Sequence, residues 1–331
     1  MSEVIVVGAG VVGLAAAHEL ARAGHRVTAV SADVPGSRQS CGLTRIFRLA
    51  HADGQLTDAA AASLGLWQEW EGRAGRPLLD RVGLLLTGDM TDREAHLARY
   101  GGVERGSGPR HPLAIALEGW AFEPTGAAIR AEETVRFLQE GLELVLAEVL
   151  AADARGVTLA EGQRLDAERV IVCAGPDTYR LCDLPEPQRM RTVRLSFALR
   201  EPLANPAPCW INRDEGLCEP FYAVMDGPDH YSIGLSGGEP AELPEAEHVR
   251  QAYPRIVRIA QRLFPGLRPV AERLVACEFP LRAHTADPSL AHDGWDLIQN
   301  DGLVGLTGPA LFKFAPTLGR LAVEHLDRVA V

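Results

Sequence analysis

The chain of 331 residues is 47% hydrophobic and 23% charged, which is typical of a globular protein and argues against extended disorder. Its 44 acidic and 33 basic residues give a net charge of −11, which disfavours general binding to nucleic acid or to an anionic membrane surface. No apolar run reaches the roughly 20 residues of a membrane-spanning helix. Arginine supplies 32 of the basic residues, and Lys313 is the only lysine.

The N-terminal residues and the cysteines predict a cytoplasmic location. The first residues lack the basic start and the apolar core of a secretion signal. The six cysteines, at positions 41, 173, 182, 209, 218 and 277, include no Cys-x-x-Cys pair, so neither a zinc site nor a thioredoxin-like motif is indicated. We therefore expect reduced thiols and no metal site.

Residues 4–30 predict a strand–helix–strand unit that binds a dinucleotide. Residues 4–7 are an apolar run typical of a buried parallel strand, residues 14–23 indicate a helix, and residues 26–30 indicate a second strand. The intervening residues 8–13 read Gly-Ala-Gly-Val-Val-Gly. In this pattern the glycines allow a tight turn, close approach of a pyrophosphate, and close packing of helix on strand, while the helix N-terminus attracts phosphate. The predicted cofactor ligands are Gly8, Gly10, Val11, Val12 and Gly13.

The acidic residue that binds ribose hydroxyls in such folds is displaced in this chain. The second strand ends at Val30 and is followed by Ser31, whereas the acid, Asp33, comes later in the loop. Either Ser31 or Asp33 is therefore the candidate ribose ligand.

Two further segments favour FAD over NAD. Residues 170–175, Val-Ile-Val-Cys-Ala-Gly, predict another apolar strand that ends in a turn of small residues. Residues 302–308 predict a glycine-rich strand and turn that lead into a helix over 317–328. Such a helix start favours negative charge, which a flavin acquires on its pyrimidine ring when it is reduced. We assign to the cofactor the residues Cys173, Ala174, Gly175, Gly308, Phe312 and Lys313.

In this order the three segments resemble the D-amino-acid oxidase superfamily of FAD enzymes. The closer likeness is to the branch of monomeric sarcosine oxidase and N-methyltryptophan oxidase. Residues 44–48, Thr-Arg-Ile-Phe-Arg, are similar to the Thr-Arg-Ile-x-Arg segment of that branch, and residues 312–314, Phe-Lys-Phe, match its C-terminal Gly-Phe-Lys-Phe. The likeness spans nearly the whole chain, although it is weak between about 176 and 275.

The resemblance implies an α/β fold in which a Rossmann-like FAD-binding domain of the two-dinucleotide-fold type is interleaved with an antiparallel-sheet substrate domain. We expect the FAD-binding domain to comprise residues 1–75, 120–178 and 285–331. The substrate domain would then comprise residues 76–119 and 179–284.

The resemblance also implies FAD-dependent oxidation of a C–N bond, in which hydride passes to the flavin and an imine forms. The substrate would be a small carboxylate-bearing amine or an N-alkyl amino acid. By matched position, Arg48 and Lys313 would form a clamp for the carboxylate, Thr44 and Arg45 would lie at the flavin, and Tyr222 would line the pocket. The donor fork of an arginine and the point charge of a lysine suit a carboxylate.

Two departures from the family pattern leave questions open. The sarcosine-oxidase branch uses a lysine on the cavity strands to activate oxygen, and Ser232 stands at that place, so the electron acceptor is O₂ or another molecule. That branch also bonds its flavin to a cysteine. Cys277 is the candidate here, although its spacing from the C-terminal segment is longer than in the family, and Cys41 is a weaker alternative.

Three other functions remain compatible with these residues. One is a biosynthetic tailoring enzyme that acts on a larger amine, another is a flavin-binding protein without turnover, and the third is an NAD-dependent dehydrogenase. The expected partners are a small-molecule amine and an electron acceptor, with no nucleic acid and no membrane. The sequence does not predict an oligomeric state.

Overall fold

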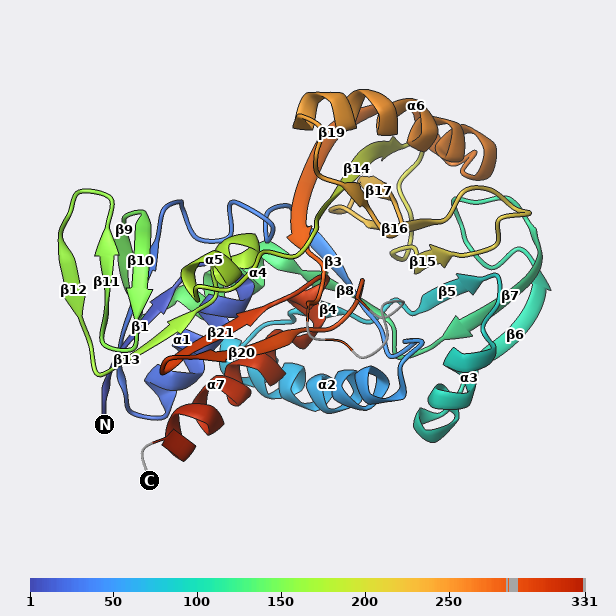
Figure 1. The fold of residues 1–331 in the computed structure, drawn as a ribbon. Helices are drawn as coiled ribbons and strands as arrows, with labels where there is room; N and C mark the ends of the chain where they lie inside the picture. Colours follow the sequence, from blue (N-terminus) through green and yellow to red (C-terminus); the bar gives the residue numbers. More distant parts are fainter. Residues whose placement is uncertain (284, 286–290, 330–331) are drawn as a thin grey trace.

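The computed structural model describes residues 1–283, 285 and 291–329, and a six-stranded sheet forms the part nearest both termini (Figure 1). Its strand order is β20-β21-β13-β1-β2-β9. Five strands are parallel, and β20 pairs antiparallel with β21 at the edge. The strands are β1 (Glu3–Val7), β2 (Arg26–Ser31), β9 (Glu143–Leu146), β13 (Arg169–Val172), β20 (Asp296–Asn300) and β21 (Leu303–Thr307).

Both faces of this sheet are covered, which explains the continuous apolar run of β1. Val4 and Val6 pack into one hydrophobic cluster, and Ile5 and Val7 pack into another on the opposite face. The first face is covered by α1 (Val11–Arg22), α4 (Ala131–Gln139) and α7 (Ala315–Val329), with α2 (Gly54–Ala74) packed on α7. The second face carries β10 (Val149–Asp153), β11 (Gly156–Leu159), β12 (Arg164–Asp166) and α5 (Thr178–Leu181).

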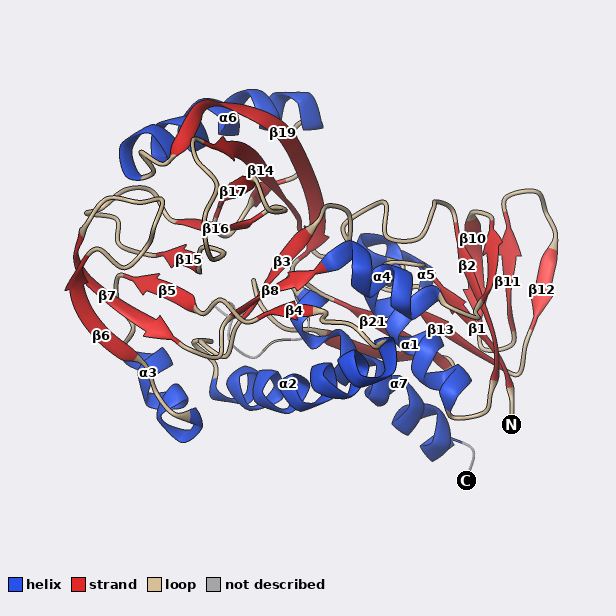
Figure 2. Ribbon diagram, turned by 180° about the vertical axis from the view of Figure 1, so that it is seen from behind, coloured by secondary structure: helices blue, strands red, loops and turns tan. Residues whose placement is uncertain are grey.

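A second sheet of nine strands lies beyond the first, under α6 (Glu245–Leu263) (Figure 2). Its order is β18-β14-β17-β16-β15-β5-β7-β6, and β19 pairs with β14. Ile256 and Leu263 of α6 pack on Trp210 and Phe221 of the sheet. The strands are β5 (Leu84–Thr87), β6 (Glu104–Gly108), β7 (Leu117–Glu123), β14 (Arg189–Leu199), β15 (Cys209–Asn212), β16 (Phe221–Met225), β17 (His230–Leu235), β18 (Glu239–Pro240) and β19 (Leu267–Pro280).

A small three-stranded sheet of order β3-β8-β4 lies between the two larger sheets. It consists of β3 (Thr44–Phe47), β8 (Ala127–Arg130) and β4 (Leu79–Asp80). The short helices are α3 (Thr91–Leu97), η1 (Ala98–Tyr100), η2 (Gly175–Asp177) and η4 (Leu311–Phe314).

The mixed α/β class predicted from the sequence is confirmed. The first helix begins at Val11, earlier than predicted, because Gly10 ends the loop in an extended conformation. The second large sheet is antiparallel except for one parallel pair, β5 with β15. The division into FAD-binding and substrate domains stays a prediction. Within the described residues, we find no helix with the length and apolarity that a membrane span requires.

Candidate active site

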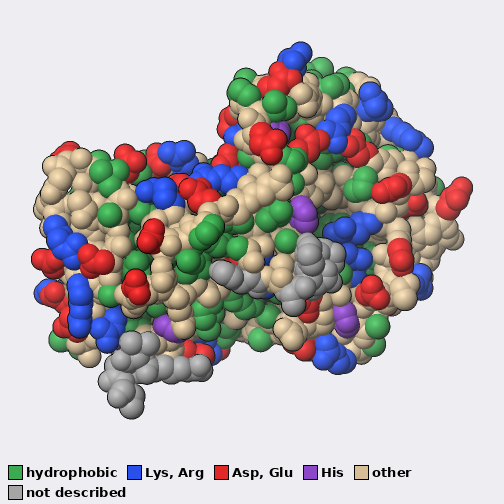
Figure 3. All heavy atoms as spheres, viewed as in Figure 1, with side chains coloured by type: hydrophobic (Ala, Val, Ile, Leu, Met, Phe, Trp, Pro, Cys, Tyr) green, Lys and Arg blue, Asp and Glu red, His purple; other side chains and the backbone are tan. Residues whose placement is uncertain are grey.

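A cavity of about 1510 Å³ runs from the glycine-rich loop after β1 to Lys313. In the space-filling view, the surface is notched between the part that carries β10–β12 and the part that carries α6 (Figure 3). The cavity is bounded by the carboxyl ends of the parallel strands, where ligands of open α/β sheets bind. Predicted cofactor residues on its wall are Gly8, Gly10, Val11, Val12, Ser31, Asp33, Cys173, Ala174, Gly175 and Gly308. Further predicted residues on its wall are Arg45, Arg48, Tyr222, Cys277, Phe312 and Lys313.

Two predicted residues, Gly13 and Thr44, lie behind the cavity wall. A Cβ on Gly13 would sit 1.9 Å from the carbonyl oxygen of Gly8, so Gly13 permits the close packing that its place in the motif implies. The Thr44 hydroxyl donates to the carbonyl of Met225 at 2.7 Å and thereby ties β3 to β16.

The glycine-rich end of the cavity fits a dinucleotide. Gly8 has a φ of +103°, and a Cβ there would lie 2.3 Å from the carbonyl oxygen of Cys173. Helix α1 begins at the cavity wall after Gly10, and the Ser40 hydroxyl accepts from the amide of Val11 at 2.9 Å, so the positive dipole end and the remaining first-turn amides can attract a phosphate. Ser31 and Asp33 both reach the wall, and Asp33 also pairs with Arg38 at 2.6 Å.

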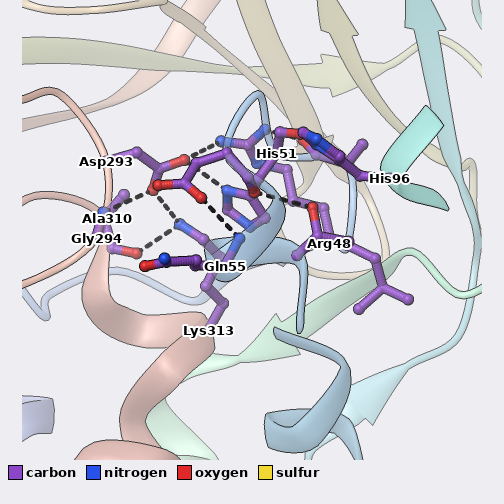
Figure 4. A network of polar contacts seen from close by, with 12 residues as sticks. Arg48, His51, Gln55, His96, Asp293, Gly294, Ala310 and Lys313 are labelled. Carbon is purple, nitrogen blue, oxygen red and sulfur yellow. Dashed lines mark hydrogen bonds and ion pairs between the residues drawn. The ribbon is translucent and has the colours of Figure 1, made fainter. Parts of the chain in front are cut away.

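At the other end of the cavity, Arg48 and Lys313 converge on one carboxylate, that of Asp293 (Figure 4). Lys313 Nζ lies 3.0 Å from Oδ1 of Asp293, and Arg48 Nη2 lies 2.8 Å from Oδ2. His51 Nδ1 lies 2.7 Å from the same Oδ2. The side chain of Lys313 is only 3% exposed, so it is not a surface lysine.

Burial and neighbouring charges set the protonation of this cluster. Burial lowers the pKa of Lys313, the Asp293 carboxylate offsets part of this shift, and the net pKa is about 8. Burial alone would raise the pKa of Asp293, but Lys313, together with His51 and Arg48, holds it well below its usual range. Burial lowers the pKa of His51 to about 3. At neutral pH the cluster is therefore an ion pair of Asp293 with two cations, and His51 is neutral.

Buried hydrogen bonds fix the backbone on both sides of the clamp. The Glu123 carboxylate accepts from the amide of Leu49 at 2.7 Å and from the amide of Ala50 at 3.0 Å, which holds the loop after Arg48. From α2, the Ser63 hydroxyl and the Trp67 indole donate to the carbonyl of Lys313 at 2.8 and 3.0 Å. The positions of Arg48 and Lys313 are therefore fixed through hydrogen bonds to the backbone at or next to them, not only through the contacts of their side chains.

A second group of cations lines the cavity near the small sheet. Burial lowers the pKa of the Arg45 guanidinium, as does the neighbouring charge of Arg194. Arg194 on β14 donates to the carbonyl of Thr44 at 2.9 Å, and its side chain is 5% exposed. Its Nε and Nη2 have no hydrogen-bond partner among the described residues, and the Asp226 carboxylate lies 3.7 Å from Nη2.

Ser232, which stands where the family has an oxygen-activating lysine, is fully buried. It shares a hydrogen bond of 2.5 Å with the hydroxyl of Ser196, which donates to Asp226 at 2.6 Å. Strand pairing sets Ser196 opposite Ser232 and Arg194 opposite Gly234. Through Ser196 and Asp226, Ser232 is therefore connected to the buried Arg194. The sequence alone does not distinguish Arg194, because it is one of many arginines in a stretch of weak resemblance.

The two cysteines considered for a covalent flavin lie together on the cavity wall. A hydrogen bond with Cys277 lowers the pKa of Cys41 to about 6, and the same bond, together with burial, raises the pKa of Cys277. Both sulfurs belong to reduced cysteines. A covalent link to flavin through Cys277 stays a prediction. No group of residues able to hold a metal ion occurs among the described residues.

The cavity begins at a dinucleotide-binding fold and continues to a second glycine-rich strand that leads into a helix. This combination defines the class of protein as a flavin-type, nucleotide-binding oxidoreductase. Comparison with known families agrees. The sequence profile described as "FAD dependent oxidoreductase" matches residues 3–325. The chain belongs to this family, and its cofactor is FAD.

Curated relatives and solved structures are similar along nearly the whole chain. N-methyl-L-tryptophan oxidase of Salmonella arizonae is 24% identical, over 97% of this chain and 94% of the relative. The solved structure of NikD, described as an unusual amino acid oxidase essential for nikkomycin biosynthesis, has a TM-score of 0.81 at 21% identity and covers 98% of this chain and 93% of its own. Glycine oxidase from Bacillus cereus has a TM-score of 0.74 at 17% identity, covering 98% and 96%.

Proposed function

We propose that this oxidoreductase oxidises the C–N bond of a small amine that carries a carboxylate, such as an amino acid or an N-alkyl amino acid. The observation that carries the proposal is the convergence of Arg48 and Lys313 on a single carboxylate at the cavity wall. The named activities of N-methyl-L-tryptophan oxidase, NikD and glycine oxidase support the same class of substrate.

Bound FAD supplies the acceptor for a hydride from the carbon beside the amine nitrogen, which leaves an iminium, the protonated form of the imine. The glycine-rich loop and α1 would hold its pyrophosphate, with Ser31 or Asp33 at the ribose. Arg48 and Lys313 would fix the carboxylate and so orient the carbon that loses the hydride. Arg45 and Arg194 would place positive charge where the cofactor gains negative charge.

No proton transfer is assigned to the histidine of the clamp. His51 is fully buried, and its Nδ1 hydrogen-bonds to Asp293. Burial lowers its pKa to about 3, so it remains neutral at the pH at which an amine is deprotonated and reactive. Its role in the proposed reaction is to orient the carboxylate between the two cations.

Purified holoprotein tests the proposal directly. Anaerobic addition of a matching amino acid or N-alkyl amino acid should bleach the flavin absorption, and air would then show whether O₂ or another molecule is the acceptor. Lys313→Met should weaken binding of substrate carboxylate while FAD stays bound, because Lys313 contributes one of the two cations. An unchanged KM in this variant would contradict the clamp role.

A second candidate, supported by the likeness to NikD and by the serine at position 232, is a tailoring enzyme that acts on a bulkier amine. Turnover of such an amine, without turnover of sarcosine or simple amino acids, would favour it.

A cytoplasmic location remains part of the proposal. A colourless protein that rejects FAD would contradict both candidates.

A further inference from the structure

The carboxylate that Arg48 and Lys313 hold belongs to the chain itself. Each oxygen of Asp293 faces a different cation, at 3.0 Å from Lys313 Nζ and 2.8 Å from Arg48 Nη2, and His51 contacts the oxygen that faces Arg48 (Figure 4). This is the arrangement that a bound substrate carboxylate would have in the clamp. Asp293 therefore occupies the subsite that the proposed function assigns to substrate.

The donors of the clamp are largely engaged when Asp293 is in place. Lys313 Nζ also donates to the carbonyl of Ala310 at 2.8 Å, and Arg48 Nη1 donates to the carbonyl of Ala50. A second carboxylate added to the same site would meet a like charge at close range, which is unfavourable. Substrate and Asp293 are consequently alternatives at this site, and their binding is competitive.

Two further cations lie within electrostatic reach of Asp293. Arg93 and Arg213 line the same cavity, and the attraction of Asp293 contributes to the pKa of each. Burial, followed by the repulsion of Arg93 and Arg48, lowers the pKa of Arg213 to about 10. A carboxylate released from the clamp thus remains beside positive charge, which reduces the cost of its displacement.

We propose that Asp293 is an internal ligand of the carboxylate subsite, which a substrate or inhibitor carboxylate must replace in order to bind. The proposal rests on the proposed function of Arg48 and Lys313. The apparent dissociation constant of any carboxylate is then the intrinsic one divided by the fraction of molecules in which Asp293 is out of the clamp. This factor is the same for every ligand carboxylate, so Asp293 weakens all of them equally, and only those with further contacts in the cavity retain appreciable affinity.

The experiment compares holoprotein variants in their affinity for acetate, followed by the change in flavin absorbance and checked by calorimetry. Asp293→Asn keeps the size of the side chain and removes its charge, and it should tighten acetate binding by at least about tenfold. Asp293→Ser, a second variant that retains less of the hydrogen bonding, should tighten it similarly. Flavin content and circular dichroism confirm that each variant is folded.

Asp92→Asn is the matched control. Asp92 contributes to the pKa of Arg93 and lines a smaller pocket that shares Arg93 and Arg213 with the cavity, so its removal changes the local charge by the same amount without touching the clamp. We expect a change of less than about twofold, because an exposed charge is screened by salt.

The outcomes separate the inference from the proposed function. Tighter acetate binding in both Asp293 variants, but not in the control, supports the internal ligand. Unchanged or weaker binding in Asp293→Asn and Asp293→Ser overturns it, even if Lys313→Met abolishes acetate binding in the otherwise unaltered protein. Acetate binding that Lys313→Met leaves unaffected would instead contradict the clamp and, with it, the proposed function.

Discussion

Glu123 offers the sharpest test of how the scaffold supports the site. Its buried carboxylate bridges the amides of Leu49 and Ala50, and it also accepts from the Thr125 hydroxyl at 2.9 Å. Glu123→Gln replaces one carboxylate oxygen with an amide NH₂. Whichever way this amide is turned, one of the two backbone N–H groups faces a donor.

The cost follows from these contacts. A buried donor left without a partner costs about 1–3 kcal/mol, and the remaining bond loses the strength that the charge gave it. We therefore expect the free energy of unfolding to fall by about 2–3 kcal/mol. The loop that carries Arg48 should also lose its fixed position, and acetate binding by the holoprotein should weaken.

The assay is urea unfolding followed by circular dichroism, at a constant excess of FAD because a bound cofactor adds to stability. A slightly alkaline pH keeps the carboxyl ionised, since burial raises the pKa of Glu123 while the amides of Leu49 and Ala50 and the Thr125 hydroxyl lower it. Thr125→Val removes one hydrogen bond and leaves both amides paired, so it should cost about 1 kcal/mol or less. If Glu123→Gln matches Thr125→Val in both stability and acetate affinity, the bridging role is wrong.

Three further predictions concern the cofactor, pH and thiol reactivity. Gly13→Ala should abolish FAD binding, because the new Cβ would lie 1.9 Å from the carbonyl oxygen of Gly8. The control Gly65→Ala has open space around its new Cβ and should retain a normal flavin content. A yellow Gly13→Ala protein would contradict the packing assigned to Gly13. Because the pKa of His51 is about 3, acetate affinity of a Cys41→Ser protein, which lacks the thiol that titrates near pH 6 in the same cavity, should show no inflection between about pH 5.5 and 7.5. An inflection near the ordinary histidine value in that protein would show that His51 titrates there. Cys41, with its pKa lowered to about 6, should react with iodoacetamide at neutral pH before Cys218, because burial raises the pKa of Cys218 to about 11. Faster labelling of Cys218 than of Cys41 in peptide mass spectra would refute this order.

The sequence predicts those parts of the structure that local patterns determine. The nucleotide end of the cavity can be predicted because its signals involve residues only a few positions apart. These signals are the apolar run before Gly8, the spacing of the glycines and the small residues after β13. Arg48 and Lys313 were identified by resemblance, and the structure brings them together.

Asp293 and Arg194 could not be predicted in the same way. Asp293 comes from a loop before β20 with no motif around it, and only the folded chain brings it to Arg48, which follows β3, and to Lys313 of η4. Arg194 alternates with the apolar Val193 and Leu195 in the sequence of β14, a pattern that predicts an exposed side chain, whereas residues 193–199 of the folded strand are all buried. Long-range contacts of single polar residues leave no periodic signal in a sequence.

The packing of the two terminal segments has a consequence for biosynthesis. Helix α1 buries Leu14, Ala15 and Ala16 completely, and much of this face packs against α7 at the other end of the chain. Because α1 is synthesised well before α7, this apolar face stays uncovered until α7 has been made. Apolar surface exposed during that interval favours aggregation, and a chain that stops before Lys313 would lack both the cover of this face and the lysine of the clamp.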